Sequence, residues 1–213
     1  MKNAPFLFVA LWLLVTSCSQ AQSGPIVKRT LDLPAIEAIG LGLNGTLYLK
    51  QGSRQEVVIE AQESLLDKIN TSVQDGSWTI EFKGLQLSKY QPIVVYITLA
   101  DIRSIAVGGS GKVIAEKAFQ LDQPLEISIG GSGLVQMKGT APKAEISIAG
   151  SGKVEAEDFE VEKCEVSIAG SGKTYIHVNS QLEVSVAGSG KVFYKGNPQT
   201  ESSIAGSGKV EKM

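Results

Sequence analysis

The sequence predicts an all-β protein, a single-stranded parallel β-helix (solenoid) with coils of about 20 residues and an atypical, β-rich N-terminal cap. A Gly-Ser-Gly core recurs six times, and apolar and polar residues alternate on both sides of it. The cores begin at Gly109, Gly131, Gly150, Gly170, Gly188 and Gly206, with spacings of 22, 19, 20, 18 and 18 residues. A nearly fixed period of this kind is typical of stacked repeat proteins, in which each unit contacts only its neighbours.

Each repeat reads as two strands joined by a glycine turn. Residues 145–148 are Glu-Ile-Ser-Ile and residues 165–168 are Glu-Val-Ser-Ile, and this period of two is typical of a half-buried strand. Burying a large apolar side chain contributes roughly 1.5–3 kcal/mol, whereas ordering each residue costs on the order of 1.5 kcal/mol. A single unit with about four inward side chains is therefore unstable alone and has to stack. A hairpin meander or a sandwich is the competing arrangement, but it does not require an identical turn at every second connection.

Stacking one coil per repeat aligns outward side chains into columns. We interpret the charged columns as solvated faces that discourage aggregation, although a glutamate column is also compatible with binding a divalent cation through oxygen ligands. The acidic column contains Glu126, Glu145, Glu165, Glu183 and Glu201, and the basic column contains Lys112, Lys153, Lys173, Lys191 and Lys209, interrupted by Leu134.

The column beyond the lysines is not uniform, and it supplies the candidate binding face. It runs through Ile114, Gln136, Glu155, Tyr175, Phe193 and Glu211. The candidate binding face consists of Lys173, Tyr175, His177, Lys191 and Phe193, since exposed aromatic rings beside polar groups suit a sugar or a protein surface. The alternative, which we favour, is that the two rings stack on each other across the coils.

No cofactor, metal or catalytic residue is predicted. His177 is the only histidine, and its strand phase places it on the solvent side. The segment 169–174 resembles the end of a phosphate-binding loop, but Ser167 stands where that motif needs glycine and a strand follows instead of a helix. A uniform glutamate column also offers no distinct acid and base. We therefore predict a protein that is not an enzyme.

The N-terminal third differs from the repeats. We assign residues 31–100 to a capping region and residues 101–213 to the Gly-Ser-Gly β-helix. Residues 41–49 resemble a degenerate first unit, and residues 64–69 suit a single helical turn. Residues 92–99 read as the strand that leads into the regular stack.

Residues 1–17 have the pattern of a bacterial lipoprotein signal peptide, with Lys2 before an apolar run that is short for a membrane span. Residues 15–18, Val-Thr-Ser-Cys, match the lipoprotein box, so we expect lipid attachment at Cys18 and a tether over residues 18–30. Ser19, and not Asp, follows the cysteine, which favours the outer membrane in organisms that use Asp as a retention signal. We expect the protein on either the periplasmic or the surface face of that membrane. Ordinary secretory cleavage after Ala21 is the alternative.

The mature chain of 196 residues is large enough for one domain with a sizeable core. Loss of Lys2 leaves a net charge of −3, and without a basic surplus nucleic acid is not an expected partner. Apart from Cys18 the chain has one cysteine, Cys164, which points inward by strand phase and has no internal partner for a disulfide.

The serial Ile-(Ala/Gly)-Gly-Ser-Gly-Lys-Val units, the segment 75–80 and the closing Tyr-Lys-Gly-Asn-Pro of residues 194–198 resemble the autotransporter-adhesin head domain, or GIN domain. The resemblance covers residues 34–210 and implies a β-helical fold similar to pectin lyases but without their catalytic residues. It also implies a role in adhesion. We therefore expect a lipid-anchored cell-envelope binding or structural protein that adheres to glycan or protein surfaces. The alternative is a carbohydrate-active, pectin-lyase-like enzyme of the envelope.

The last repeat reaches Val210 without an atypical closing unit in this sequence. Solenoids normally cover their open core at both ends. We therefore expect Ile204 and Val210 to be covered either by a second copy, as an end-to-end homodimer, or by the N-terminal region of the same chain.

Overall fold

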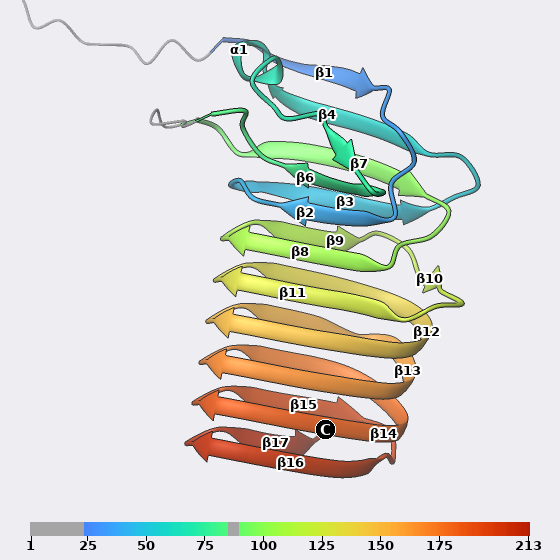
Figure 1. Ribbon diagram of the computed structural model, residues 1–213, viewed down its shortest axis with the longest axis vertical. Coiled ribbons are helices and arrows are strands. Elements are labelled where there is room, and N and C mark those ends of the chain that lie inside the picture. The colour runs from blue at the N-terminus through green and yellow to red at the C-terminus, as the bar shows by residue number, and fades with distance from the viewer. Residues whose placement is uncertain (1–23, 85–89) are drawn as a thin grey trace, which may run out of the picture.

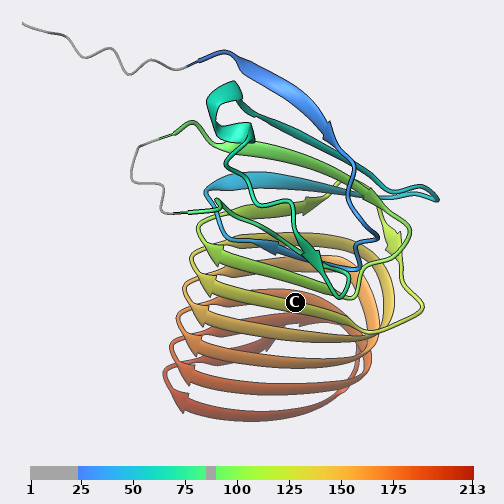
Figure 2. The same ribbon diagram turned by 45° about the horizontal axis from the view of Figure 1, so that its top comes forward.

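Parallel strands stack into a tall solenoid with coils of about 20 residues, as the repeat predicts (Figure 1). The computed structural model describes residues 24–84 and 90–213. Each coil has a front strand and a back strand, joined at one side by the Gly-Ser-Gly turn and at the other by a wider bend (Figures 1 and 2).

Residues 24–84 and 90–99 form β1 (Ile26–Leu31), β2 (Ala38–Leu41), β3 (Gly45–Gln51), β4 (Glu56–Gln62), α1 (Glu63–Leu66), β5 (Val73–Gln74), β6 (Ser77–Ile80) and β7 (Ile93–Leu99). The repeats form β8 (Ser104–Gly109), β9 (Lys112–Ala115), β10 (Phe119–Gln120), β11 (Leu125–Gly131), β12 (Leu134–Gly150), β13 (Lys153–Gly170), β14 (Lys173–Gly188), β15 (Lys191–Lys195), β16 (Gln199–Gly206) and β17 (Lys209–Lys212). The longest strands, β12 to β14, run along the back of one coil and then along the front of the next, because they continue through the bend.

The register confirms one coil per repeat. Ile148 of β12 pairs with Ile168 of β13 in a parallel ladder, and both side chains are buried in the core. Ser147 and Ser167 pair beside them and are exposed. Parallel pairing continues through β16 and β17, so the meander with antiparallel neighbours is wrong for the repeat region.

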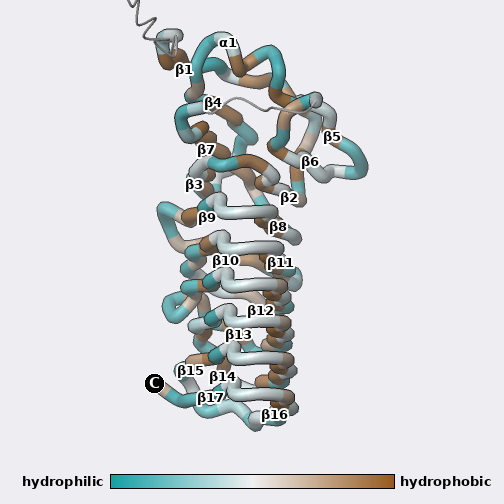
Figure 3. Tube along the Cα trace, turned by 90° about the vertical axis from the view of Figure 1, so that its left-hand side faces the viewer, coloured by the Kyte–Doolittle hydropathy of each residue, from teal (hydrophilic) through white to brown (hydrophobic). Residues whose placement is uncertain are grey.

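The turn requires glycine for two different reasons. Gly150 has a φ of +121°, and a Cβ added there would lie 2.6 Å from the carbonyl oxygen of Gly131 on the preceding coil. A Cβ on Gly172 would lie 2.6 Å from Cγ2 of Ile148, which occupies the space above the turn. The first glycine is thus needed for its backbone conformation and the second for core volume. Because Ser151 N–H donates to the Gly131 carbonyl at 2.8 Å, the ladder continues through the turn. Figure 3 shows the turns of successive coils lying one above another.

The differences in repeat length are absorbed at the bend, opposite the glycine turns. Between Ala156 and Glu160, β13 has three residues without pairing partners in the neighbouring strand β14. Between Val178 and Gln181, β14 has one residue more than β13 has between Val161 and Lys163. The net difference of two residues accounts for a period of 20 followed by one of 18. Bulges are the usual way in which a sheet accommodates extra residues without losing register elsewhere.

The coils do not stack in chain order at the N-terminal end. β2 pairs with both β6 and β8, and β3 pairs with both β7 and β9, all in parallel. The coil of residues 38–51 therefore lies between the coil of residues 77–99 and the first repeat coil (Figure 1). Although β7 precedes the repeats in sequence, it is not their neighbour in space. The stack thus crosses the boundary that we placed at residue 100.

An antiparallel layer of strands covers the N-terminal end of the stack. β4 pairs with β7, and β1 pairs with β4, while α1 contributes the single helical turn expected near residues 64–69. Residues 26–31 are thus a strand and not part of the expected tether, because Val27 and Leu31 pack on the core and Arg29 forms an ion pair with Asp67. Covering of the C-terminal coil by the N-terminal region is also wrong, since that region lies at the opposite end and Ile204 is 40 % exposed.

Candidate functional site

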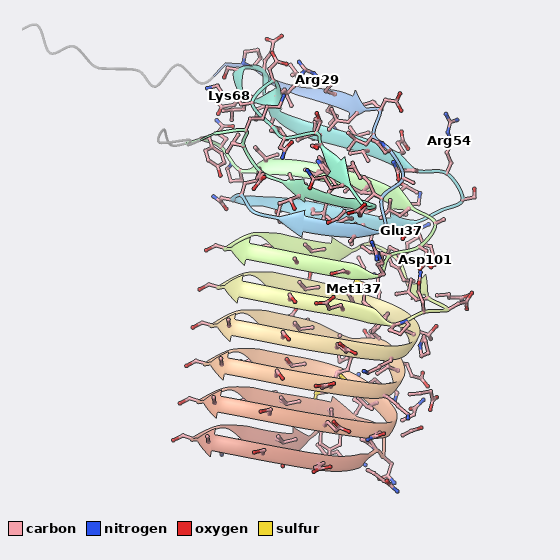
Figure 4. The ribbon with its side chains drawn as sticks, viewed as in Figure 1. Arg29, Glu37, Arg54, Lys68, Asp101 and Met137 are labelled. Atoms are coloured by element: carbon pink, nitrogen blue, oxygen red, sulfur yellow. The ribbon has the colours of Figure 1, made fainter. Side chains whose placement is uncertain are left out.

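The front face, nearest the viewer in Figure 1, repeats the same outward residues on successive coils. The glutamate column is in register from Glu126 to Glu201, and a serine column runs beside it from Ser128 to Ser203. Short side chains with oxygen tips accordingly recur at the same positions (Figure 4). The described residues contain no group of three or more His, Cys, Asp and Glu arranged to hold a metal ion.

The back face carries the varied column, and the structure extends it into the N-terminal coils. Tyr48 pairs with both Tyr96 and Ile114, so the column has an aromatic pair at each of two levels. In order along the stack it contains Tyr96, Tyr48, Ile114, Gln136, Glu155, Tyr175, Phe193 and Glu211. Sequence reasoning missed Tyr48 and Tyr96 because the interleaved coil order cannot be read from the repeat.

The aromatic residues stack on each other, which confirms the arrangement that we favoured. The ring centroids of Tyr175 and Phe193 are 4.9 Å apart, with 16° between the planes. Those of Tyr48 and Tyr96 are 5.4 Å apart, with 14° between the planes. The Lys153 ammonium lies 4.9 Å from the Tyr175 centroid. Because both faces of Tyr175 are occupied, the ring presents its outer edge.

The register brings the candidate binding face together. Lys173 pairs with Lys191, and Tyr175 pairs with Phe193 on the adjacent coil. His177 belongs to the same ladder and is half-buried, so the expectation that it is simply solvent-facing holds only in part. Its ladder partner Lys195 was not among the residues predicted for the binding face. The Lys195 ammonium donates to the Glu157 carbonyl at 3.2 Å and pairs with Asp158 at 3.5 Å, which ties two non-adjacent coils together.

A hydrogen-bonded group surrounds Glu155 in this column. The Lys153 ammonium and the Gln136 amide both donate to its carboxylate. The hydrogen bond from Lys153 lowers the pKa of Glu155 against the opposing effect of burial, and Gln136 adds to the lowering. The same bond raises the pKa of Lys153. Glu155 is therefore a fixed anion with both oxygens engaged.

The bend beside this column is acidic and contains the bulge of β13. Asp158 is held by Lys195, and Glu162 accepts hydrogen bonds from Ser180 and Asn179, which lower its pKa. Glu157 differs, because its Oε2 is buried and has no hydrogen-bond partner within the described ranges. A groove of about 200 Å³ lies here, lined by Ile114, Ala115, Gln136, Met137, Lys138, Glu155, Glu157 and Asp158.

Cys164 lies in the core, as its strand phase predicts. It is 3 % exposed, and burial raises the pKa of its thiol to about 12. A thiol in this environment stays protonated and unreactive at neutral pH.

The lipidation site Cys18 and the signal peptide of residues 1–17 lie outside the described residues. In the part of the chain that the structure does describe, no helix has the length and apolar character needed to cross a membrane.

Comparison with solved structures supports the fold. A protein titled "putative adhesin" from Bacteroides fragilis NCTC 9343 is 22 % identical, with a TM-score of 0.73 over 89 % of this chain and 97 % of that one. A "putative lipid binding protein" from Parabacteroides distasonis ATCC 8503 is 21 % identical, with a TM-score of 0.56 over the same shares. A "putative adhesin" from Parabacteroides merdae ATCC 43184 is 22 % identical, with a TM-score of 0.53 and again the same shares.

No curated protein matches the chain. The profile of one protein family matches residues 36–198, which are most of the chain and include both the N-terminal coils and the repeats. The chain therefore belongs to the family described as "Putative auto-transporter adhesin, head GIN domain".

Proposed function

We propose that this protein is a lipid-anchored, adhesin-like binding protein of the cell envelope and not an enzyme. The observation that carries the proposal is the stack itself, which presents long columns of outward side chains in register on two faces. An extended, repetitive surface is suited to contact with a polymer or another surface along its length. Membership of an adhesin head family and the titles of the similar structures support the same role.

The ligand class that we propose is a glycan or an envelope protein, bound at the back face around Lys173, Tyr175, His177, Lys191 and Phe193. The two lysines and the aromatic edges lie on adjacent coils and are at least partly accessible. They offer charge, hydrogen bonds and apolar contact over one continuous strip.

A binding screen tests this role. The chain carrying Cys18→Ala is incubated with envelope polysaccharide, with cell-wall sacculi and with outer-membrane vesicles, and retained protein is measured. We expect retention by at least one fraction and weaker retention of the double variant Lys173→Ala/Lys191→Ala. Absence of retention by all three would contradict the binding role, and release of shortened oligosaccharides would favour the envelope enzyme instead.

The anchoring is tested separately. We propose that Cys18 carries the lipid and holds the protein at the outer membrane. Cys18→Ala should move the protein from the membrane pellet to the soluble fraction, whereas Cys164→Ala should not. Equal membrane retention of wild type and Cys18→Ala would overturn the lipoprotein assignment.

We also propose that two copies pair end to end through β16 and β17. Within the described ranges these strands have no neighbour on their outer side, and Ile204 is exposed at that edge. Ile204→Lys should then lower the sedimentation coefficient of the detergent-free Cys18→Ala chain to that of a monomer. A wild-type chain that sediments as a monomer at high concentration contradicts the pairing.

A further inference from the structure

The groove lined by Glu155 and Glu157 lies next to the candidate binding face and does not include its residues. It spans three coils of the back face. Two tyrosines of the varied column lie just beyond its two ends. Tyr48 is the ladder neighbour of Ile114 at one end, and Tyr175 is the ladder neighbour of Glu155 at the other. The two tyrosines are four coil steps apart, roughly 19 Å at about 4.8 Å per step.

Two of the three carboxylates in this groove are already compensated. Glu155 is engaged by Lys153 and Gln136, and Asp158 is paired with Lys195. The groove is therefore not an open cluster of carboxylates that would call for a cation. Among the described residues that line it, Glu157 contributes a buried side-chain acceptor, Oε2, that has no hydrogen-bond donor.

A bulge in β13 accounts for the position of Glu157 beside the groove. Between Glu155 and Asp158, β13 has one residue more than β12 between Gln136 and Lys138. Bulges re-aim side chains, and they recur beside functional sites. A buried carboxylate oxygen that lacks a hydrogen bond is unfavourable, so a ligand that donates a hydrogen bond to it relieves that cost.

We propose that this back-face groove binds a short stretch of a neutral glycan, whose hydroxyl groups donate to Glu157 and accept from Gln136 and Lys138. A carboxylate only accepts hydrogen bonds and an ammonium only donates them, whereas an amide does both. Hydroxyl groups match this mixed lining because each can donate and accept. The proposal rests on the proposed binding function and names the ligand class and the site.

The lining spans two coil steps, roughly 10 Å at about 4.8 Å per step, and the tyrosines one step beyond each end extend this strip, which favours a short chain of sugars over a single sugar. Tyr48 and Tyr175 lie one coil step beyond its two ends, and an amphipathic ring edge with a hydroxyl suits both the apolar and the polar parts of a sugar. A ligand that reaches both tyrosines has to extend along the stack axis.

The experiment uses the full-length protein in detergent and an array of neutral, amino and uronic-acid oligosaccharides of graded length. We expect binding to neutral oligosaccharides that strengthens with length until the groove is filled. Glu157→Gln should weaken binding roughly tenfold, which corresponds to one hydrogen bond to a charged group. Glu126→Gln, on the front glutamate column, is the matched control and should bind like wild type.

Two further variants keep the proposal testable should Glu157→Gln impair folding. Gln136→Ala removes a second polar group from the lining, and Tyr175→Phe removes only a hydroxyl while keeping the ring stack; both should weaken binding. No binding to any oligosaccharide, equal losses in Glu126→Gln, or preference for a lysine-rich peptide would overturn the groove. If sacculi or vesicles still retain the protein in that case, the adhesin-like function stands and only the groove assignment falls.

Discussion

The front face repeats itself from coil to coil, whereas the back face changes. On the front, Ser147, Ser167 and Ser185 succeed one another in register. On the back, the corresponding succession is Gln136, Glu155 and Tyr175. Both faces belong to the same coils and cover the same core, so the difference does not come from the requirements of the fold. Variation marks the surface on which the protein is free to carry specific contacts.

Next to the repetitive front face, the Gly-Ser-Gly turns should tolerate amino-acid substitution least. Gly150→Ala places a methyl group against the Gly131 carbonyl at a φ of +121°. We expect a loss of roughly 4 kcal/mol in the free energy of unfolding, since a glycine-only backbone and an overpacked contact each cost about 1–3 kcal/mol. Gly130→Ala is the control, because nothing lies within 4 Å of its Cβ position and Ala149 occupies the same column. Denaturant unfolding of both variants measures the difference, and equal stabilities would refute this account of the turn.

The core should respond almost as strongly. Ile148→Ala removes a buried side chain that pairs with Ile168, and such changes cost roughly 2–5 kcal/mol. Ser147→Ala, one position away and exposed, should cost little. The urea midpoints of the two variants provide the comparison; similar midpoints would mean that the alternation of inward and outward residues does not govern stability.

Thr174 offers a gain in stability on the varied side. It is fully buried between Val154 and Val192 in the inward column, and its hydroxyl has no hydrogen-bond partner among the described residues. Thr174→Val should raise the free energy of unfolding by about 1–2 kcal/mol, since it removes an unsatisfied buried hydroxyl at similar shape. Val154→Thr is the reciprocal variant and should lower it. A thermal melt in which Thr174→Val unfolds earlier than wild type would reveal a partner for the hydroxyl.

The smallest effect concerns Cys164. Its pKa is raised to about 12 in the folded chain, from 9.0 for an unburied thiol, so only the unfolded chain releases the proton between these values. Its contribution to stability is complete below pH 9 and is lost as the pH rises toward 12. Wild type should therefore lose about 1 kcal/mol more than Cys164→Ala between pH 9 and 10. Ala144 holds the equivalent place on the preceding coil, which makes alanine a fitting control. Parallel stability curves for the two chains would contradict the burial argument.

The sequence predicts the repeat region well because local rules dictate it. Alternation around Ile148 and the glycine pair of each turn specify strand direction, register and inward face without reference to distant residues. The place of Tyr48 and Tyr96 in the back column was not predictable, because it depends on strands 38–51 being enclosed by segments that follow them in the chain. Glu157 was missed for another reason. The extra residues of its repeat are visible as a longer period, but their number does not reveal which side chain the bulge turns toward the groove.

The enclosed coil of residues 38–51 changes how this solenoid folds and comes apart. In an array stacked in chain order, an end unit can fray away while the rest stays paired. Here the segment synthesised before the other coils has both its neighbours encoded later, so its two ladders close only after β6, β7, β8 and β9 exist. Contacts of this range slow the search for the native state. They also fasten the N-terminal end to the repeats. The outer coil of residues 77–99 is joined to β8 by residues 100–103, which pass the enclosed coil of residues 38–51. Pulling the outer coil away by force therefore has to displace this loop.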